Sequence, residues 1–186
     1  MSRSEESARL GSRVYVALGS NLGDSPEILR RAMNRLDLLA SKPVVRSSLW
    51  CSTPVDCPPD SPVFTNAVVG LDPRASETPE SLLRQLQALE VEFGRRPKQV
   101  HNEARPLDLD LICWGVEQRN TSFLILPHPR AHLRRFVLAP LAELDPGLRL
   151  PGQRHTIAEW LELADPDPGL RRVGGVEAHR EGGIVE

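Results

Sequence analysis

Two aspartates separated by one residue, Asp108 and Asp110, are the strongest candidates for chemistry in this chain. They alternate with Leu107, Leu109 and Leu111, and successive side chains of a strand point to opposite faces. Both carboxylates therefore share one face, with Cα atoms about 6.6 Å apart. Paired oxygen ligands suit Mg²⁺, which takes one or two protein carboxylates and completes its shell with water and substrate phosphates. The pattern predicts a magnesium site that handles a polyphosphate, although a solvated strand face shows the same alternation.

Cationic side chains lie close to this acidic pair in the sequence. Arg105 stands three residues before Asp108, and a guanidinium beside an anion site is what phosphate binding requires. The polar segment 94–105 contains further cations, among them Arg95 and Lys98. We expect this segment to be either a lid that closes cations over phosphates or an ordinary solvated loop.

The segment 19–23, with the sequence GSNLG, lies between an expected strand and an expected helix. Backbone N–H groups and the helix dipole can face an anion at such a position. The segment lacks the pattern of a P-loop, so a simple chain reversal with a helix cap explains it equally well.

Two further groups of polar residues lie on either side of the aspartates. Gln87 and Glu90 are next to the leucine stripe of an expected helix, where they border a cleft or face the solvent. His128 stands between two prolines, which give its ring a defined direction, and Arg134 follows six residues later. Each of these residues is suited to bind a ligand or to serve the structure alone.

A fourth group combines aromatic, hydroxyl and amide side chains. Thr53 and Pro54 precede a proline-rich loop, and Phe64 and Asn66 follow it. These side chains are the parts needed to hold a planar heterocycle by ring contacts and hydrogen bonds. Core packing for Phe64 and turn chemistry for Asn66 are the alternative explanations.

The elements that must position these residues follow the order βαββαβ. Short apolar runs predict the strands, and leucines at helical spacing behind Pro26 and Thr78 predict the helices. This order indicates an α+β, ferredoxin-like sandwich, an antiparallel sheet with two helices on one face and C-terminal helical additions. The expected strands are 14–18, 44–50, 63–71 and 107–112, and the additions comprise a mostly helical segment 130–143 and a short helix with a capping box at 156–159.

Composition predicts a single domain with polar ends. The chain has 186 residues, of which 40% are apolar, enough for one buried core. We expect the folded domain to span 13–164. The segments 1–12 and 165–186 are polar and contain glycine or proline, and we expect both to be disordered tails.

Charge and cysteine content exclude several classes of protein. A net charge of −2 gives no basic field that would hold nucleic acid or an anionic membrane surface. Three cysteines without a C-x-x-C spacing suggest neither a disulfide framework nor a zinc site. No segment approaches the roughly 18 apolar residues of a membrane span. We expect a cytoplasmic monomer with small-molecule partners.

Four segments, taken together and in this order, resemble the 6-hydroxymethyl-7,8-dihydropterin pyrophosphokinase family. They are VALGSNLGD, TP followed by FTNA, ARPLDLDLI, and LPHPR followed by RRFVLAPL. The resemblance runs from about Val14 to Leu150. It implies the ferredoxin-like sandwich and the transfer of pyrophosphate from ATP to the hydroxymethyl group of the dihydropterin, a step in folate biosynthesis that also yields AMP.

The resemblance also implies roles for individual residues. Two Mg²⁺ ions are bound by Asp108 and Asp110. The residues implied as catalytic are Arg95, Arg105 and Asp108. The residues implied to contact ATP are Gln87, Glu90, Arg105, Leu111, His128 and Arg134. The residues implied to form the pterin pocket are Thr53, Pro54, Val55, Phe64, Asn66, Asp108 and Phe136.

Several positions depart from the family pattern. Val55 stands where a second proline is common, which affects the expected conformation of the proline-rich loop between Thr53 and Phe64, which we call the pterin loop. Pro97 occupies a position often held by arginine, so we expect a slower enzyme or a changed affinity for ATP.

Two other functions remain open from the sequence. A catalytically weak relative would bind nucleotide or pterin as a sensor or scaffold, and a phosphohydrolase would use the same carboxylates on water. The presence of both Asp108 and Asp110 argues against the first. The second lacks an obvious general base, although His128 offers one.

Overall fold

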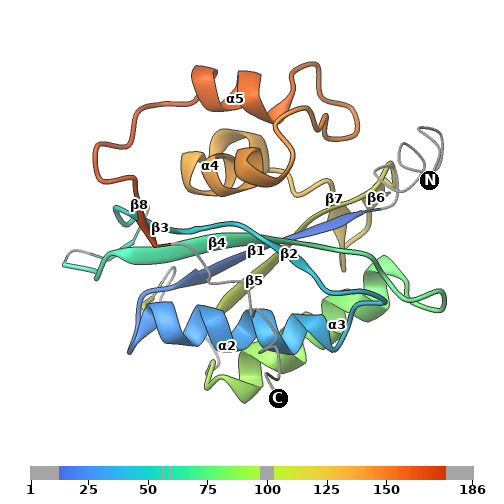
Figure 1. Cartoon of the computed structure of the whole chain (residues 1–186), viewed down its shortest axis with the longest axis horizontal. Coiled ribbons are helices and arrows are strands. Elements are labelled where there is room, and N and C mark those ends of the chain that lie inside the picture. The colour runs from blue at the N-terminus through green and yellow to red at the C-terminus, as the bar shows by residue number, and fades with distance from the viewer. Residues whose placement is uncertain (1–12, 56, 59, 97–102, 175–186) are drawn as a thin grey trace, which may run out of the picture.

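The computed structural model describes residues 13–55, 57–58, 60–96 and 103–174. A central sheet separates two helical layers, with α2 and α3 on one face and α4 and α5 on the other (Figure 1). The strands of the sheet are β1 (Val14–Ser20), β2 (Val45–Arg46), β3 (Leu49–Ser52), β4 (Phe64–Leu71), β5 (Asp108–Trp114) and β8 (Arg171–Gly174). The α-helices are α2 (Ser25–Asp37), α3 (Pro79–Glu92), α4 (Arg135–Leu144) and α5 (Ile157–Leu163). The remaining elements are a small hairpin of β6 (Arg119–Asn120) and β7 (Ile125–Leu126) and the 3₁₀ helix η1 (Ala131–Leu133).

The sheet has the topology that the sequence predicts. Its strands are ordered β5-β1-β4-β3-β8, β2 pairs with β4, and every pair is antiparallel. The chain runs from β1 through α2 to β2 and β3. The later strand β4 lies between β1 and β3 in the sheet. This arrangement is the split βαβ of a ferredoxin-like fold and confirms the predicted α+β class.

Alternation along the strands divides the core into two layers. On β1, Val14, Val16 and Leu18 face α2 and α3, whereas Tyr15 and Ala17 face α4. Because both faces are covered, β1 is almost wholly apolar, which is why its sequence shows a continuous run rather than an alternating one.

The helices begin where their capping residues predict. Asp24 accepts a hydrogen bond from the backbone N–H of Glu27 at the start of α2, at 3.2 Å. The hydroxyl of Thr78 caps α3, and Thr156 with Glu159 forms the predicted capping box of α5.

The expected strand 44–50 is divided in the structure into β2 and β3. Ser47 interrupts the pairing, because its N–H donates to the carbonyl of Val68 while its hydroxyl accepts from the Val68 N–H. The backbone N–H of Ser48 then donates to the Glu143 carboxylate of α4, at 2.7 Å. Serine side chains that bond to the backbone thus replace ladder contacts at this point.

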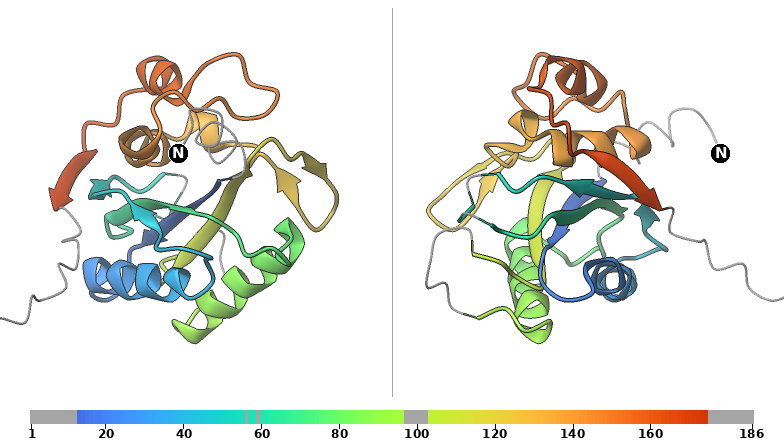
Figure 2. Two further views of the ribbon diagram at one scale, coloured as in Figure 1. Left: turned by 45° about the vertical axis from the view of Figure 1, so that its right-hand side comes forward. Right: turned by 90° about the vertical axis from the view of Figure 1, so that its left-hand side faces the viewer.

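The predicted C-terminal boundary needs correction. Residues 165–174 are part of the folded chain, because β8 pairs with β3 at the edge of the sheet (Figure 2). Backbone pairing with an available edge requires few apolar side chains, so composition alone did not reveal it. The tail segments 1–12 and 175–186 lie outside the described residues.

Two further features of the described residues bear on the sequence analysis. No helix among them is long and apolar enough to cross a membrane. The cysteines are free thiols, of which Cys51 and Cys113 are buried and Cys57 is half-buried.

Candidate active site

The sheet face toward α4 brings the predicted residues together. Gly19 of β1 pairs with Asp108 of β5 on one side and with Asn66 of β4 on the other. Ala17 likewise pairs with Asp110. Because these two β1 residues have little or no side chain, space remains between the acidic strand and β4. The sequence pattern of small residues in an otherwise bulky strand marks this opening, although we did not predict it.

A cavity of about 270 Å³ occupies this space, between the sheet and the start of α4. Residues of β1, β4, β5, the β3–β4 connection and the α4 region line it. Of the residues predicted from the sequence, the cavity brings together Thr53, Val55, Phe64, Asn66, Arg105, Asp108, Asp110, Arg134 and Phe136.

Each aromatic wall of this cavity is associated with a guanidinium group. The guanidinium carbon of Arg105 lies 5.8 Å from the ring centre of Phe64, and that of Arg134 lies 5.6 Å from the ring centre of Phe136. Such stacking holds a cation in place without neutralising it. Both guanidinium groups are therefore held at the cavity wall, next to the aspartates with which they also pair.

A second cavity, of about 280 Å³, lies on the other side of Asp110, which lines both. Its walls are largely apolar, with Leu83 from α3, Leu111 from β5 and Phe123 from the β6–β7 hairpin. His128 borders it as well. The sequence analysis predicted Leu111 and His128 as ligand contacts and missed Leu83 and Phe123, because neither a helix leucine nor a residue of a short hairpin carries a distinctive pattern.

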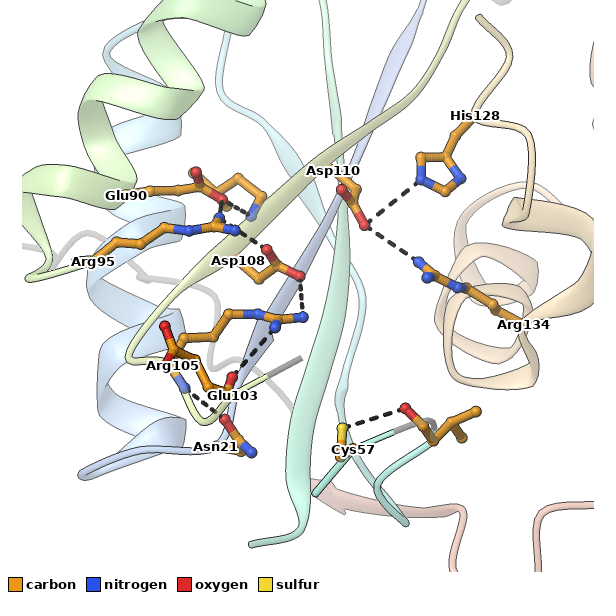
Figure 3. A network of polar contacts seen from close by, with 12 residues as sticks. Asn21, Cys57, Glu90, Arg95, Glu103, Arg105, Asp108, Asp110, His128 and Arg134 are labelled. Carbon is orange, nitrogen blue, oxygen red and sulfur yellow. Dashed lines mark hydrogen bonds and ion pairs between the residues drawn. The ribbon is translucent and has the colours of Figure 1, made fainter. Parts of the chain in front are cut away.

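Asp108 is held by two arginines (Figure 3). Nη1 of Arg95 lies 2.9 Å from its Oδ1, and Nη2 of Arg105 lies 2.8 Å from its Oδ2. Arg95 reaches this point because Gly94, with φ of +93°, reverses the chain at the end of α3. A metal or phosphate that enters must compete for these contacts.

Asp110 faces a different pair of side chains, an arginine and a histidine. Its Oδ2 lies 3.5 Å from Nη1 of Arg134 and 3.9 Å from Nε2 of His128 (Figure 3). Burial lowers the pKa of His128, and the nearby Arg134 acts in the same direction, while Asp110 opposes them. Burial also lowers the pKa of the Arg134 guanidinium.

Glu90 lies inside the protein rather than at either cavity. Its carboxylate accepts from the backbone N–H of Leu109 at 2.7 Å and pairs with Arg95 (Figure 3). Only 6% of the residue is exposed, and burial raises its pKa to about 7 against the opposing effects of these two partners. Glu90 thus joins α3 to β5 and orients the arginine that binds Asp108.

Asn21 is a further residue that the sequence analysis did not assign to the site. Its side-chain oxygen accepts from the backbone N–H of Arg105 at 2.9 Å, and its backbone N–H donates to the Arg105 carbonyl at 3.2 Å. Its amide nitrogen also donates to the carbonyl of Pro62, at 3.4 Å. The GSNLG segment therefore holds Arg105 and the loop between β3 and β4 in place, and the N–H of Asn21 is engaged by the Arg105 carbonyl.

Like Glu90 and Arg95, two further predicted residues line neither cavity. Gln87 is exposed on α3, and Pro54 is half-buried next to Thr53, and neither lines the cavities within the described chain. Of the expected lid 94–105, residues 97–102, which include Pro97, lie outside the described residues.

The donor atoms fit Mg²⁺ better than a metal enclosed by protein alone. Within the described ranges there is no group of three or more histidine, cysteine, aspartate or glutamate side chains arranged to hold a metal. Two carboxylates on one strand, next to three guanidinium groups and an imidazole, suit an ion whose remaining ligands are water and phosphate oxygens. Such a site is able to bind a polyphosphate and a flat heterocycle together.

Comparison with known proteins gives a consistent result. The family described as 7,8-dihydro-6-hydroxymethylpterin-pyrophosphokinase (HPPK) matches residues 15–146. A 2-amino-4-hydroxy-6-hydroxymethyldihydropteridine pyrophosphokinase of Pseudomonas aeruginosa is 41% identical over 164 residues, covering 88% of this chain and 98% of that protein. A protein of the same name from Synechocystis is 38% identical over 168 residues, covering 87% of this chain and 84% of that protein.

Solved structures show the same fold at low sequence identity. A crystal structure of HPPK-DHPS in complex with substrates superposes with a TM-score of 0.64 at 11% identity, covering 82% of this chain and 43% of that chain. A Plasmodium falciparum HPPK-DHPS triple mutant with pteroate gives a TM-score of 0.60 at 12% identity, covering 81% and 43%. The chain spans less than half the length of these two proteins.

Proposed function

This chain belongs to the 7,8-dihydro-6-hydroxymethylpterin-pyrophosphokinase family, and from this premise we propose that it transfers pyrophosphate from ATP to 6-hydroxymethyl-7,8-dihydropterin. The products are AMP and the pterin diphosphate, and the reaction is a step in folate biosynthesis. The observation that carries the proposal is a pair of cavities that meet at Asp110, one with aromatic walls and one with apolar walls.

We assign the first cavity to the pterin. Phe64 and Phe136 supply faces for a planar ring, and Asn66 and Thr53 supply polar groups at its edge. Asn66 is fixed for this purpose, because its amide nitrogen donates to the Ser52 hydroxyl at 2.8 Å. Its side-chain oxygen is then left to accept from a ligand. Pro54 and Val55 complete the loop on this side.

We assign the second cavity to the adenosine part of ATP. Leu111 offers an apolar surface to the base, and His128 borders the same space close to Asp110. Arg134 and Arg105 then face the phosphates where the two cavities meet. For Gln87 and Glu90 we propose a less direct role in ATP binding than the family resemblance implies. Glu90 acts through Arg95, and Gln87 is exposed on α3.

Asp108 and Asp110 are the residues that would hold two Mg²⁺ ions. When bound, the ions neutralise negative charge on the phosphates and orient them for in-line displacement. Arg95 and Arg105 would leave the Asp108 carboxylate and turn to the phosphates, because a metal-bound carboxylate has less charge to offer them. The same two arginines would thus stabilise the charge that develops in the transition state.

The reaction itself requires positioning more than covalent chemistry. The primary alcohol of the pterin forms a bond to the β-phosphorus of ATP, the bond from that phosphorus to the bridging oxygen of the α-phosphate breaks, and AMP leaves. The alcohol loses its proton to solvent in this step, and Asp108 is the carboxylate that we assign to orient the hydroxyl. Holding alcohol and phosphate in line accounts for much of the expected rate.

The remaining proposals concern the setting of the enzyme. We propose a monomer that acts in the cytoplasm on small molecules and does not bind nucleic acid. The charge of −2 supports the last of these, because it provides no extended basic surface.

Product analysis tests the proposed function. The protein is incubated with MgATP, with and without 6-hydroxymethyl-7,8-dihydropterin, and the products are separated and identified by mass. We expect AMP and the pterin diphosphate in equal amounts, and only with pterin present. ADP or pterin-independent hydrolysis would favour a phosphohydrolase, and tight binding without turnover would favour a binding module.

A further inference from the structure

The segment from Ala164 to Leu170, which we call the C-terminal strap, crosses from α5 to β8 beside the pterin loop (Figure 1). It contains two prolines and a turn closed by a hydrogen bond from the Leu170 N–H to the Asp167 carbonyl, at 3.0 Å. None of the residues assigned to the proposed reaction belongs to this segment. Its contacts nevertheless end on a residue that lines the first cavity.

Asp167 connects the strap to the pterin loop. Its Oδ1 accepts from the hydroxyl of Thr53 at 2.9 Å and from the backbone N–H of Gly169 at 2.9 Å. Thr53 lines the cavity and is the first residue after β3. At the other end of the loop, Asn21 bonds to the carbonyl of Pro62. The pterin loop is therefore held by hydrogen bonds near both of its ends, and Asp167 accepts the one at Thr53.

The hydrogen bond also decides what Thr53 can offer to a ligand. A threonine hydroxyl has one proton, and here that proton is directed to Asp167. Any additional hydrogen bond of this oxygen must then be one that it accepts. A dihydropterin carries ring N–H and amino groups that donate, so a fixed acceptor at this position favours it.

Gly169 shows how closely the strap approaches the loop. A Cβ atom placed on this glycine would lie 2.4 Å from Cγ2 of Thr53 and 3.4 Å from its backbone nitrogen. Even a methyl group would therefore displace the threonine or the strap.

Both ends of the strap are held independently of Asp167. Nη1 of Arg135, in the first turn of α4, donates to the carbonyls of Leu161 and Ala164 at 2.8 and 3.1 Å. At the other end β8 pairs with β3, with Cys51 opposite Arg171. Loss of the Asp167 carboxylate should therefore release Thr53 without detaching the strap.

We propose that Asp167 is a positioning residue for the pterin, which fixes Thr53 as a hydrogen-bond acceptor at the cavity wall. The proposal rests on the proposed function, because it names the dihydropterin as the ligand. It adds two residues of the strap, Asp167 and Gly169, to those that determine pterin affinity.

A double-mutant cycle tests the proposal. Asp167→Ala is combined with Thr53→Val, and steady-state KM values for pterin and for ATP are measured with kcat and the midpoint of thermal unfolding. We expect Asp167→Ala alone, which removes the acceptor of the Thr53 hydroxyl, to raise the KM for pterin about three- to tenfold, the effect of one lost hydrogen bond. The KM for ATP should change less than about twofold, within the range of a neutral surface substitution. In the Thr53→Val background the same substitution should have no further effect on the KM for pterin.

Matched controls separate positioning from a general loss of structure. Asp165→Ala removes a carboxylate from the same strap at an exposed position, and Gly147→Ala adds a methyl group where the nearest atom is 3.9 Å away. Both should behave like the wild type, whereas Gly169→Ala should repeat the effect of Asp167→Ala.

Three results would overturn the proposal. The first is that the effects of the two substitutions on the KM for pterin simply add. The second is a proportional loss of kcat and of both affinities, together with a lower unfolding midpoint. Either result would refute the positioning role of Asp167 and leave the proposed function intact. A wild-type protein without pterin-dependent AMP formation would overturn both proposals, so the two failures are distinguishable.

Discussion

Replacing Glu90 by glutamine should make the protein more stable at alkaline pH than the wild type. Burial raises the pKa of this carboxyl from an ordinary value of 4.5 to about 7. Glutamine has almost the same shape, and its carbonyl oxygen can still accept from the backbone N–H of Leu109. The substitution therefore removes the titrating carboxyl group and keeps one of its two main contacts, the hydrogen bond from Leu109.

The sign of the effect follows from proton linkage. Between pH 4.5 and 7 the folded protein keeps the Glu90 proton while the unfolded chain loses it, so the free energy of unfolding decreases as the pH rises. A difference of about 2.5 pKa units corresponds to about 3 kcal/mol. Below pH 4.5 both states are protonated and this contribution is complete, and well above pH 7 it is lost.

Urea unfolding followed by tryptophan fluorescence measures this directly, at several pH values between 4.5 and 8.5. The free energy of unfolding of Glu90→Gln minus that of the wild type should rise by about 3 kcal/mol across this range. Glu92→Gln is the control, because it removes one charge from the same helix at a side chain that is 50% exposed. A difference that stays constant with pH, or one that falls, would refute the account of Glu90 as a buried carboxyl with a raised pKa.

Two further outcomes concern the cavity. Arg105→Lys keeps a positive charge but loses the planar group that contacts Asp108 and Phe64. We therefore expect kcat to fall about 10²-fold with the unfolding midpoint unchanged. An unchanged kcat, judged against the surface variant Arg30→Lys, would count against a role of Arg105 in the transition state. Removal of divalent ions with a chelator should abolish pterin-dependent AMP formation and added Mg²⁺ should restore it, whereas turnover that persists in the chelator would exclude the proposed role of Asp108 and Asp110.

Patterns that depend on neighbours in sequence were predicted well. Alternating side chains located Asp108 and Asp110 on one strand face, and capping residues located the starts of α2, α3 and α5. These features are decided within a few residues of chain, where sequence spacing and spatial proximity agree.

Features that depend on distant partners were not predicted. Glu90 lies four residues after Leu86 and so falls on the buried stripe of α3, but a charged residue is expected at the surface unless its partners are known. Those partners, the N–H of Leu109 and the guanidinium of Arg95, belong to other segments. The pairing of β8 with β3 escaped prediction for a related reason, because the backbone rather than the side chains makes the contact.

The most direct test of the central claim compares the wild type with Asp110→Ala, in which one of the two proposed metal ligands is missing. AMP formation from MgATP is measured with and without 6-hydroxymethyl-7,8-dihydropterin, and circular dichroism confirms that the variant is folded. The account predicts pterin-dependent AMP formation by the wild type and a decrease of at least about a hundredfold in the variant, since metal-bound charge stabilisation is worth several kcal/mol. A folded Asp110→Ala protein that forms AMP at the wild-type rate would contradict it.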